Sequence, residues 1–277
     1  MKEYLKMLLD IADKVRGKIL SLIDSGFDIG AVVGLNPSET LTRKIDEAAE
    51  RVIVETLSQY NVPTYMISEE MGERYVGGKE AEIVLVVDPI DGSTNAVTGI
   101  PFYSTSLALG KYRAGQTADS LSVGVVKNLA IGETFHAIKG DGAFWNSKRI
   151  MTSKGRRIDK ALVSFYAYRS LRFVSQHYEL CKYIKTRTLG SEALEICYVA
   201  KGSLDACIDV RGYSRVVDIA AARIILEEAG GVFTDLQGRK PRTPLNPKEG
   251  FSFIAASNET ILAHILDVLG RQQSGED

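Results

Sequence analysis

Two aspartates, Asp88 and Asp91, stand where a strand-forming run gives way to a turn. Residues 82–87 are rich in β-branched types, which predicts a buried strand. Pro89 cannot donate a ladder hydrogen bond, so we expect strand pairing to stop there. Gly92 permits a sharp turn or a close approach of two backbones. The pattern predicts two carboxylates at the end of a strand.

The residues after this turn add a second binding element. Ser93, Thr94 and Asn95 are side-chain types that favour the start of a helix. Carboxylate oxygens bind hard cations, and free N–H groups at a helix start bind phosphate. The segment from Asp88 to Asn95 therefore predicts both halves of a metal-dependent phosphate site.

Three more acidic residues extend this interpretation. Glu69 follows another predicted strand, although an isolated Glu-Glu pair is more often a solvated turn. Asp218 opens a predicted helix, where its alternative role is to stabilise the helix N-terminus. Asp46 lies in an amphipathic helix and, taken alone, fits a surface position. Neighbouring carboxylates repel one another unless a cation joins them, so the group as a whole favours a metal site.

The elements that must position these residues follow from the spacing of apolar residues. Helices are expected over residues 3–24, 42–59, 170–183, 191–200, 217–229 and 258–270, with a loop over 28–40 and a disordered tail from Gln272. Strands are expected at 64–68, 82–88, 104–111, 121–127, 132–138, 161–166, 184–188, 204–210 and 251–256, and a short one ends the tract 139–146. The first half resembles a meander of strands, and the second alternates strands with helices.

Composition limits the classes of function. The chain has 277 residues, 45% apolar and 25% charged, with a net charge of −1, which gives no reason to expect binding to nucleic acid or a membrane. Three cysteines without metal-ligand spacing predict reduced thiols and a cytoplasmic location. Three scattered histidines disfavour a histidine metal site or a Ser-His-Asp triad.

Two motifs in order carry a resemblance to a known family. Residues 88–95 read D-P-I-D-G-S-T-N, and residues 217–231 begin V-D-I-A-A and end E-A-G-G. With Glu69 and the segment 188–206, the chain resembles the inositol monophosphatase-like family, and most of all its archaeal-type inositol-1-monophosphatase/fructose-1,6-bisphosphatases. The resemblance covers nearly the whole chain. It implies a fold of class α+β/α/β with layered αβαβα architecture, in one catalytic domain (1–277).

This domain is expected to comprise an α+β lobe over about 1–150 and an α/β lobe over about 151–277. The resemblance also implies a role for each matching residue. Glu69, Asp88 and the carbonyl of Ile90 would hold one Mg²⁺. Asp88, Asp91 and Asp218 would hold a second, and a third, weaker ion would share Glu69.

The remaining implied roles concern water, phosphate and substrate. Asp46 would accept from the Ser93 hydroxyl, which orients and helps deprotonate a metal-bound water, with Glu69 as the third catalytic residue. The amides of Gly92 and Ser93 would bind the phosphate. The substrate-binding residues would be Asp91, Gly190, Ser191, Arg211 and Asp218.

Some positions leave alternatives open. Glu192 either faces the cleft and alters substrate choice or points to solvent. Arg211 replaces an acidic residue of inositol-preferring animal members, which suits a bisphosphate, or else it forms a structural salt bridge. A polar aromatic cluster would contact sugar or serve packing: Tyr166, Tyr168, Arg169 and Arg172.

The resemblance implies a Mg²⁺-dependent, lithium-sensitive homodimeric phosphatase acting on inositol 1-phosphate and fructose 1,6-bisphosphate by activated water. One alternative is a 3′-phosphoadenosine 5′-phosphate or NADP phosphatase of the same superfamily. Another is a non-catalytic interaction protein, which the presence of every expected metal ligand disfavours.

Overall fold

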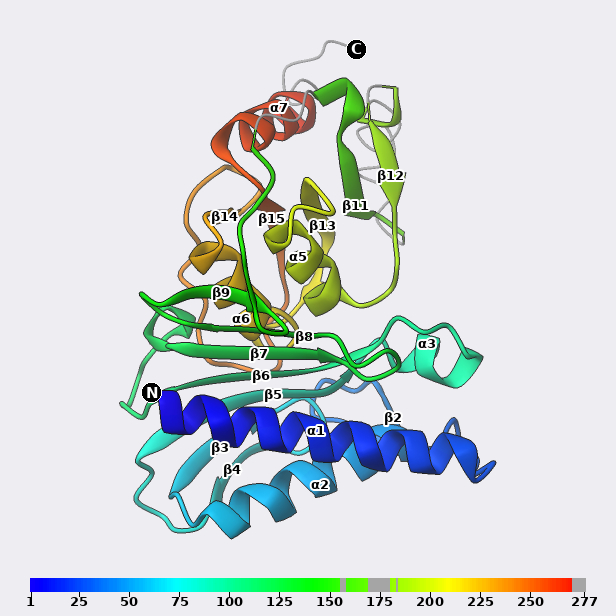
Figure 1. Ribbon diagram of the computed structural model, residues 1–277, viewed down its shortest axis with the longest axis vertical. Coiled ribbons are helices and arrows are strands. Elements are labelled where there is room, and N and C mark those ends of the chain that lie inside the picture. Colours follow the sequence, from blue (N-terminus) through cyan, green and yellow to red (C-terminus); the bar gives the residue numbers. More distant parts are fainter. Residues whose placement is uncertain (155–157, 169–179, 183, 271–277) are drawn as a thin grey trace.

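Helices and sheets alternate in five layers, as Figure 1 shows from α7 at one end to α1 and α2 at the other. The computed structural model describes residues 1–154, 158–168, 180–182 and 184–270. The helices are α1 (Lys2–Asp24), α2 (Lys44–Tyr60), α3 (Ser93–Thr98), α5 (Glu192–Ala200), α6 (Val216–Glu228) and α7 (Glu259–Gly270), with short 3-10 turns η1 (Ala118–Ser120) and η2 (Ile158–Lys160). The layered αβαβα architecture is confirmed.

An eight-stranded sheet forms the layer next to α1 and α2, in the order β10-β9-β8-β7-β6-β5-β3-β4. Its strands are β3 (Thr64–Ser68), β4 (Gly72–Val76), β5 (Ile83–Asp91), β6 (Ser104–Lys111), β7 (Val123–Asn128), β8 (Thr134–Ile138), β9 (Gly142–Trp145) and β10 (Lys148–Ile150). Strands β5 to β10 are a continuous antiparallel meander, whereas β3 runs parallel to β5. The meander confirms the prediction for the first half.

A five-stranded mixed sheet forms the other strand layer, in the order β12-β11-β13-β15-β14. Its strands are β11 (Leu162–Tyr166), β12 (Lys185–Arg187), β13 (Ala206–Ser214), β14 (Val232–Thr234) and β15 (Phe251–Ala256). Strand β13 is parallel to β11 and antiparallel to β15, so it occupies the centre of this sheet. A separate hairpin pairs β1 (Val32–Leu35) with β2 (Leu41–Arg43).

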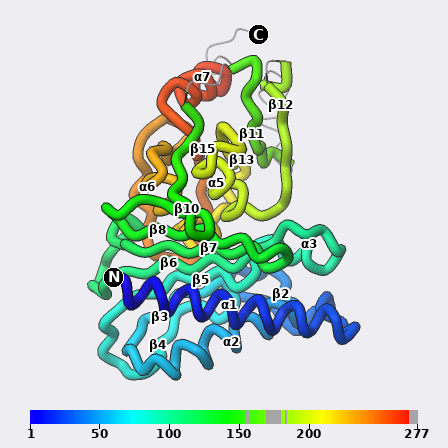
Figure 2. Tube along the Cα trace, viewed as in Figure 1, coloured from blue at the N-terminus to red at the C-terminus, as the bar shows by residue number. Residues whose placement is uncertain are grey.

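Helices α5 and α6 lie between the two sheets and join their cores, as the traces in Figures 1 and 2 show. Helix α6 is apolar around most of its circumference, and Val216, Ile219 and Ile225 are completely buried. A helix that is apolar on several faces is stable only where neighbours cover each face. The middle layer therefore fixes the start of α6, and with it Asp218, at a set place between the sheets.

Several sequence-based expectations were wrong in detail. The predicted loop over 28–40 contains strand β1, which the pattern missed because all four of its residues are exposed and show no alternation. Strand pairing does not stop at Pro89, since β5 continues to Asp91 through a bulge against β6. The short strands β2, β4, β10 and β14 were also missed. The predicted helix 170–183 lies largely outside the described residues, the tail from Gln272 lies wholly outside them, and the division into two lobes stays a prediction.

No helix among the described residues is both long enough and apolar enough to span a membrane.

Candidate active site

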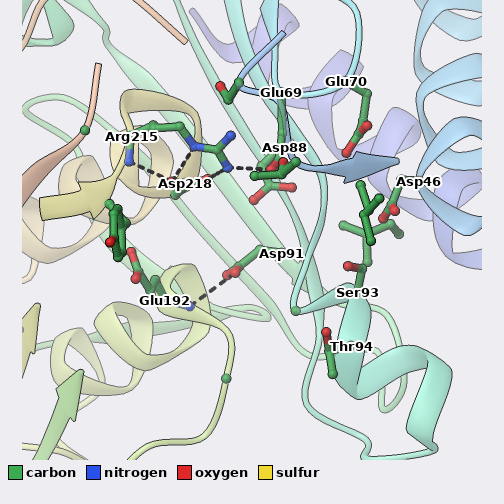
Figure 3. Close-up of a pocket in the computed structure, with 18 of the residues that line it drawn as sticks. Asp46, Glu69, Glu70, Asp88, Asp91, Ser93, Thr94, Glu192, Arg215 and Asp218 are labelled. Carbon is green, nitrogen blue, oxygen red and sulfur yellow. Dashed lines mark hydrogen bonds and ion pairs between the residues drawn. The ribbon is translucent and has the colours of Figure 1, made fainter. Parts of the chain in front are cut away.

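A cavity of about 1050 Å³ brings the predicted site residues together from five segments of the chain (Figure 3). Its wall contains all of the predicted residues except Ser191: Asp46, Glu69, Asp88, Ile90, Asp91, Gly92, Ser93, Gly190, Arg211 and Asp218. Ser191 lies behind the wall, where its hydroxyl donates to Asp91 at 2.6 Å. Residues that are far apart in the sequence therefore lie together around one cavity.

Strand pairing places Glu69 beside Asp88. Strands β3 and β5 run parallel with Ser68 opposite Val87, so the residues that follow emerge at the same sheet edge. The Glu69 amide donates to the carbonyl of Val87 at 3.1 Å and extends the pairing by one residue. Two carboxylates are thus adjacent because the two strands end in register.

A bulge separates the two aspartates of β5. Asp88 pairs with Ser106 of β6 and Asp91 pairs with Ser104, so three steps on β5 match two on its partner. An extra residue bends a strand and re-aims the side chain beyond it. Pro89, which cannot donate to the ladder, lies within this bulge. Asp91 is consequently directed toward helix α5 rather than toward Asp88.

Asp46 and Asp218 occupy equivalent positions in two helices. Each is the third residue of its helix, and each accepts the backbone N–H of the residue before the helix, Arg43 at 3.0 Å and Arg215 at 2.7 Å. This cap holds each carboxylate at the positive end of a helix dipole. The cap supports the local structure while leaving the second carboxylate oxygen for other partners.

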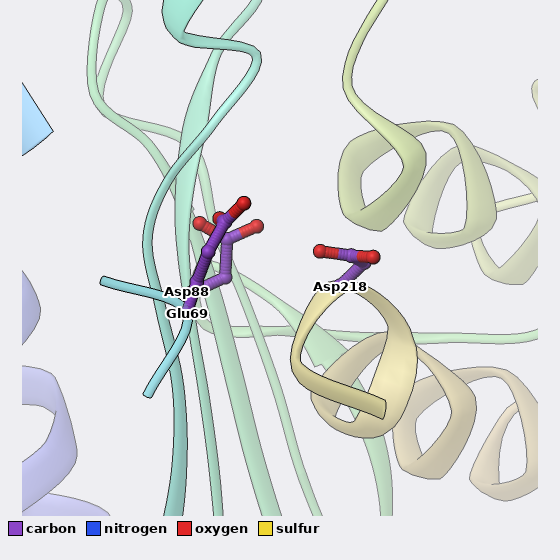
Figure 4. Close-up of side chains that lie close together, drawn as sticks. All are labelled: Glu69, Asp88 and Asp218. Atoms are coloured by element: carbon purple, nitrogen blue, oxygen red, sulfur yellow. The ribbon is translucent and has the colours of Figure 1, made fainter. Parts of the chain in front are cut away.

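Three carboxylates converge within the cavity (Figures 3 and 4). One oxygen each of Glu69, Asp88 and Asp218 lies within 4.8 Å of the others. Arg215 is the cation that contacts this group in the structure: its Nη2 pairs with Glu69 and, at 2.9 Å, with Asp218. The Oδ1 atom of Asp88 is buried and has no hydrogen-bond partner within the described part of the chain.

The electrostatics of this group call for an additional cation. Burial, then the charges of Glu69, Asp91 and Asp218, raise the pKa of Asp88 well above its usual value. Burial also raises the pKa of Glu69, although Arg215 opposes the shift. One guanidinium against one buried and two half-buried carboxylates leaves charge uncompensated. An all-oxygen donor set with an unpartnered oxygen fits a hard divalent cation such as Mg²⁺.

Asp91 connects this group to the start of α5. Its carboxylate accepts from the Ser191 hydroxyl, from the Ala193 amide at 2.8 Å and from the Glu192 amide at 3.3 Å. Burial raises the pKa of Asp91 to about 7, although these hydrogen bonds oppose the shift. Asp91 lies outside the three-carboxylate group, so its role as a metal ligand stays a prediction.

Asp46 and Ser93 lie on the opposite side of the cavity from Glu192 (Figure 3). Burial raises the pKa of Asp46 to about 7, and nearby Glu69 adds to the shift. Within the described part of the chain, no hydrogen bond joins Asp46 to Ser93. Their predicted pairing is therefore supported by shared placement on one wall and stays a prediction.

Glycine allows two backbones to meet at the turn after Asp91. Gly92 has φ +90°, and a Cβ there would lie 2.8 Å from the carbonyl oxygen of Gly190. Asn95 ties the same segments together, because its Nδ2 donates at 2.7 Å to the carbonyls of both Phe102 and Leu189. The expectation that Gly92 serves a turn and a close approach is confirmed.

Arg211 forms the structural ion pair that the sequence left open. Its Nε donates to Asp209 at 2.9 Å, and Nη2 pairs with both Asp209 and Glu192. The guanidinium carbon lies 4.6 Å from the ring centroid of Tyr166 and 4.4 Å from that of Tyr168. Glu192 is buried beside it and lines the cavity, so of the two alternatives left open for this residue the one in which it points to solvent was wrong.

Burial, followed by the charge of Asp209, raises the pKa of Glu192 well above its usual value, and Arg211 opposes the shift. Tyr166 and Tyr168 of the predicted cluster both contact the guanidinium of Arg211. Arg169 and Arg172 lie outside the described residues.

Sequence reasoning missed two residues that shape the site. Arg215 bridges Glu69 and Asp218, and its signal was its place directly before the helix that Asp218 opens. Glu70 was noted only as the neighbour of Glu69, yet it lines the cavity and accepts a hydrogen bond from Thr42. Burial, then the charge of Glu69, raises the pKa of Glu70 to about 8. Both contacts depend on segments that are distant in sequence.

Proteins similar to this chain in sequence and in structure point to the same family as the two sequence motifs. A protein of Methanothermobacter thermautotrophicus, named fructose-1,6-bisphosphatase/inositol-1-monophosphatase, is 38% identical over 94% of each chain. A bifunctional NADP phosphatase/NAD kinase of Methanococcus maripaludis is 34% identical over 98% of this chain, which spans half of that protein. The crystal structure of an inositol monophosphatase–fructose 1,6-bisphosphatase superposes with a TM-score of 0.83 at 31% identity, covering 95% of this chain and 98% of the other.

The profile described as the inositol monophosphatase family matches residues 2–273, which is nearly the whole chain. This match confirms the resemblance carried by the Asp88–Asn95 and 217–231 motifs. The chain belongs to the inositol monophosphatase family.

Proposed function

We propose that this protein is a Mg²⁺-dependent phosphatase that hydrolyses inositol 1-phosphate and fructose 1,6-bisphosphate. Its family membership and the name of the relative from Methanothermobacter thermautotrophicus support the substrate class. The observation that carries the proposal is the three-carboxylate group with the unpartnered Oδ1 of Asp88 on the cavity wall. An oxygen donor set of this kind suits Mg²⁺.

In this proposal Glu69, Asp88 and Asp218 hold the metal, with further ligands from Asp91 and the carbonyl of Ile90. Bound Mg²⁺ would lower the pKa of a coordinated water and neutralise charge on the phosphate. Two or three ions per site are proposed, and the third would share Glu69.

The chain's own residues orient the reaction. The amides of Gly92 and Ser93 hold the phosphate, and the Ser93 hydroxyl positions the attacking water. Asp46 accepts a hydrogen bond from the Ser93 hydroxyl, and as Ser93 takes a proton from the attacking water its own proton passes to Asp46, for which a pKa raised to about 7 is well placed near neutral pH. Gly190 and Ser191 support the substrate wall, and no protein nucleophile takes part.

Phosphate release tests this function directly. The protein is incubated with Mg²⁺ and each of inositol 1-phosphate, fructose 1,6-bisphosphate and NADP. We expect turnover of the first two, loss of turnover with a chelator, and recovery when Mg²⁺ is restored. Preference for NADP would contradict the substrate assignment. Absence of turnover on all three would contradict the phosphatase itself.

Three further properties belong to the same proposal. Lithium is expected to inhibit, and indifference over a wide concentration range would contradict the proposed second metal. A homodimer is expected, and a light-scattering mass of a single chain would contradict it. A reducing, cytoplasmic setting is consistent with the free thiols of Cys181, Cys197 and Cys207.

A further inference from the structure

The guanidinium of Arg215 joins two carboxylates that come from different layers of the fold. Glu69 follows strand β3 of the eight-stranded sheet, whereas Asp218 lies in the first turn of helix α6. Arg215 Nη2 pairs with Glu69 Oε1 and, at 2.9 Å, with Asp218 Oδ1. Its Nε also donates to Asp218 Oδ2 at 3.2 Å. One side chain therefore contacts both oxygens of Asp218 and one oxygen of Glu69.

The start of α6 also fixes Arg215 itself. Arg215 is the residue before the helix, and its backbone N–H donates to Asp218 Oδ2 at 2.7 Å, so backbone and side chain contact the same carboxylate. The side chain is 13% exposed and lines the cavity. The planar guanidinium fork loses less conformational entropy for each hydrogen bond than a flexible ammonium does. Arg215 is therefore a pre-organised link between the helix and the sheet.

Arg43 shows that the position before a helix does not by itself produce such a link. Arg43 precedes α2 as Arg215 precedes α6, and its backbone N–H donates to Asp46 at 3.0 Å in the same way. Arg43 also lines the cavity, but its Nη1 donates to the carbonyl of Gly30 at 3.3 Å. The bridge made by Arg215 therefore depends on the place of Glu69 in the tertiary structure.

The ion pairs of Arg215 are compatible with a metal in the same group. Its contact with Glu69 uses Oε1 alone, and each oxygen of an ionised carboxylate accepts more than one partner. When Glu69, Asp88 and Asp218 are all ionised, the guanidinium neutralises one of the three charges and a divalent cation neutralises the other two. The guanidinium and the metal therefore complement each other.

We propose that Arg215 is a positioning residue that holds Glu69 and Asp218 at the separation a divalent cation requires, and that it thereby raises the affinity of the site for Mg²⁺. One oxygen of each of these carboxylates lies within 4.8 Å of the other, which is a distance that one cation can span. Because the inference rests on the proposed function, it concerns the same metal site. Replacement of a group that orients metal ligands commonly weakens metal binding by about 10- to 100-fold.

The substitution Arg215→Lys tests this role because it keeps the positive charge and removes the fork. An ammonium is a point charge and cannot contact both oxygens of Asp218 and one of Glu69 in one plane. We expect calorimetry on protein stripped of metal to show a Kd for Mg²⁺ about tenfold higher than in the wild type. The half-saturating Mg²⁺ concentration for phosphate release should rise similarly, with kcat at saturating Mg²⁺ within about threefold.

Arg223→Lys is the matched control. Arg223 also lies on α6, its side chain is 3% exposed, and its fork pairs with Asp119 at 2.7 Å and with Glu227 at 3.1 Å outside the cavity. The control removes a buried fork from the same helix, so it measures the effect of lost stability alone. Its Kd for Mg²⁺ should equal that of the wild type, and an equal weakening in both variants would overturn the inference.

An unchanged Kd in Arg215→Lys would also overturn the inference, because positive charge alone would then suffice. If this variant does not fold, Arg215→Gln replaces it. A positioning role predicts weaker binding of Mg²⁺ by Arg215→Gln, whereas a guanidinium that only competes with the metal predicts tighter binding. A wild type that binds no Mg²⁺ would contradict the metal-dependent function as well, so that failure is distinguishable from failure of the positioning role alone.

Discussion

Two buried groups of charges in this protein are built in opposite ways. At the end of α5, Glu133 accepts from Trp145 Nε1 at 3.0 Å, from the Tyr198 hydroxyl at 2.7 Å and from Lys201 Nζ at 3.2 Å. Lys201 also lies 4.4 Å from the ring centroid of Trp145 and 4.2 Å from that of Tyr198. One charge of each sign is thus matched, and aromatic rings surround the ammonium.

The group formed by Glu69, Asp88 and Asp218 lacks this balance. Arg215 is its cationic contact, and one oxygen of Asp88 has no partner within the described residues. Both groups join the eight-stranded sheet to a helix of the middle layer. The Glu133–Lys201 group completes its own interactions and therefore serves stability. The three-carboxylate group leaves charge for a ligand to complete, which is the property of a functional site.

The largest expected effect comes from removing the unbalanced charge. Asp88→Asn should lower kcat/KM for inositol 1-phosphate by about 10³-fold or more, because a metal ligand is weakened. In the presence of a chelator the same variant should unfold at a temperature equal to or above that of the wild type, since repulsion is relieved. Phosphate release and thermal unfolding measure the two effects, with the exposed Asp141→Asn as control.

The Glu133–Lys201 group should respond in the reverse manner. Lys201→Met leaves Glu133 partly buried without its cation and should lower the free energy of unfolding by about 3 kcal/mol. We expect kcat to stay within about twofold at a temperature where the variant is folded. Denaturant unfolding measures the loss, and Lys6→Met, an exposed position on α1, is the control. A loss of activity without loss of stability would contradict the comparison.

Addition of Mg²⁺ should stabilise the wild type more than the Asp88→Asn variant. At a free concentration about thirty times Kd, linkage gives about 2 kcal/mol of stabilisation. The Lys201→Met variant should keep this increment, because its substitution lies in the other group. Thermal unfolding with and without Mg²⁺ measures the stabilisation of all three proteins. An equal stabilisation of wild type and Asp88→Asn would contradict the role of Asp88 as a metal ligand.

The pH dependence of stability should report on the carboxyl groups of the cavity whose pKa values are raised. Burial raises the pKa of Asp46 from 3.8 to about 7 and that of Glu70 from 4.5 to about 8, so the folded state binds more protons than the unfolded state between these values. Stability measured with a chelator should therefore fall as pH rises from about 4 to about 8. Mg²⁺ should reduce this fall because it favours the ionised carboxylates. A gain of stability over the same pH range in the presence of chelator would contradict the raised pKa values of Asp46 and Glu70.

Much of the fold was predictable because its elements carry strong local patterns. The helical spacing of residues 3–24 and the strand character of residues 82–87 both correspond to observed elements, α1 and β5. The strands that were missed, β1, β2, β4, β10 and β14, are short, and all four residues of β1 are exposed. Their formation depends on pairing with a partner strand, which local periodicity does not reveal.

The candidate site was likewise predictable only in part. The Asp88–Asn95 and 217–231 motifs carried the resemblance to the family and predicted an oxygen-rich ligand set, and Gly92 was predicted to allow a close approach of two backbones. Tertiary structure decided what each charge contacts: Arg215 bridges Glu69 and Asp218, and Lys201 balances Glu133.

Tertiary structure also decided what Arg211 contacts. The sequence left a phosphate ligand and a structural salt bridge equally open, and the fold places its guanidinium near the rings of two tyrosines and against Asp209 and Glu192. The sequence by itself thus determined which groups are present and the order in which they occur. Only the folded chain decided which charges compensate one another, because an ion pair depends on distances between segments far apart in sequence.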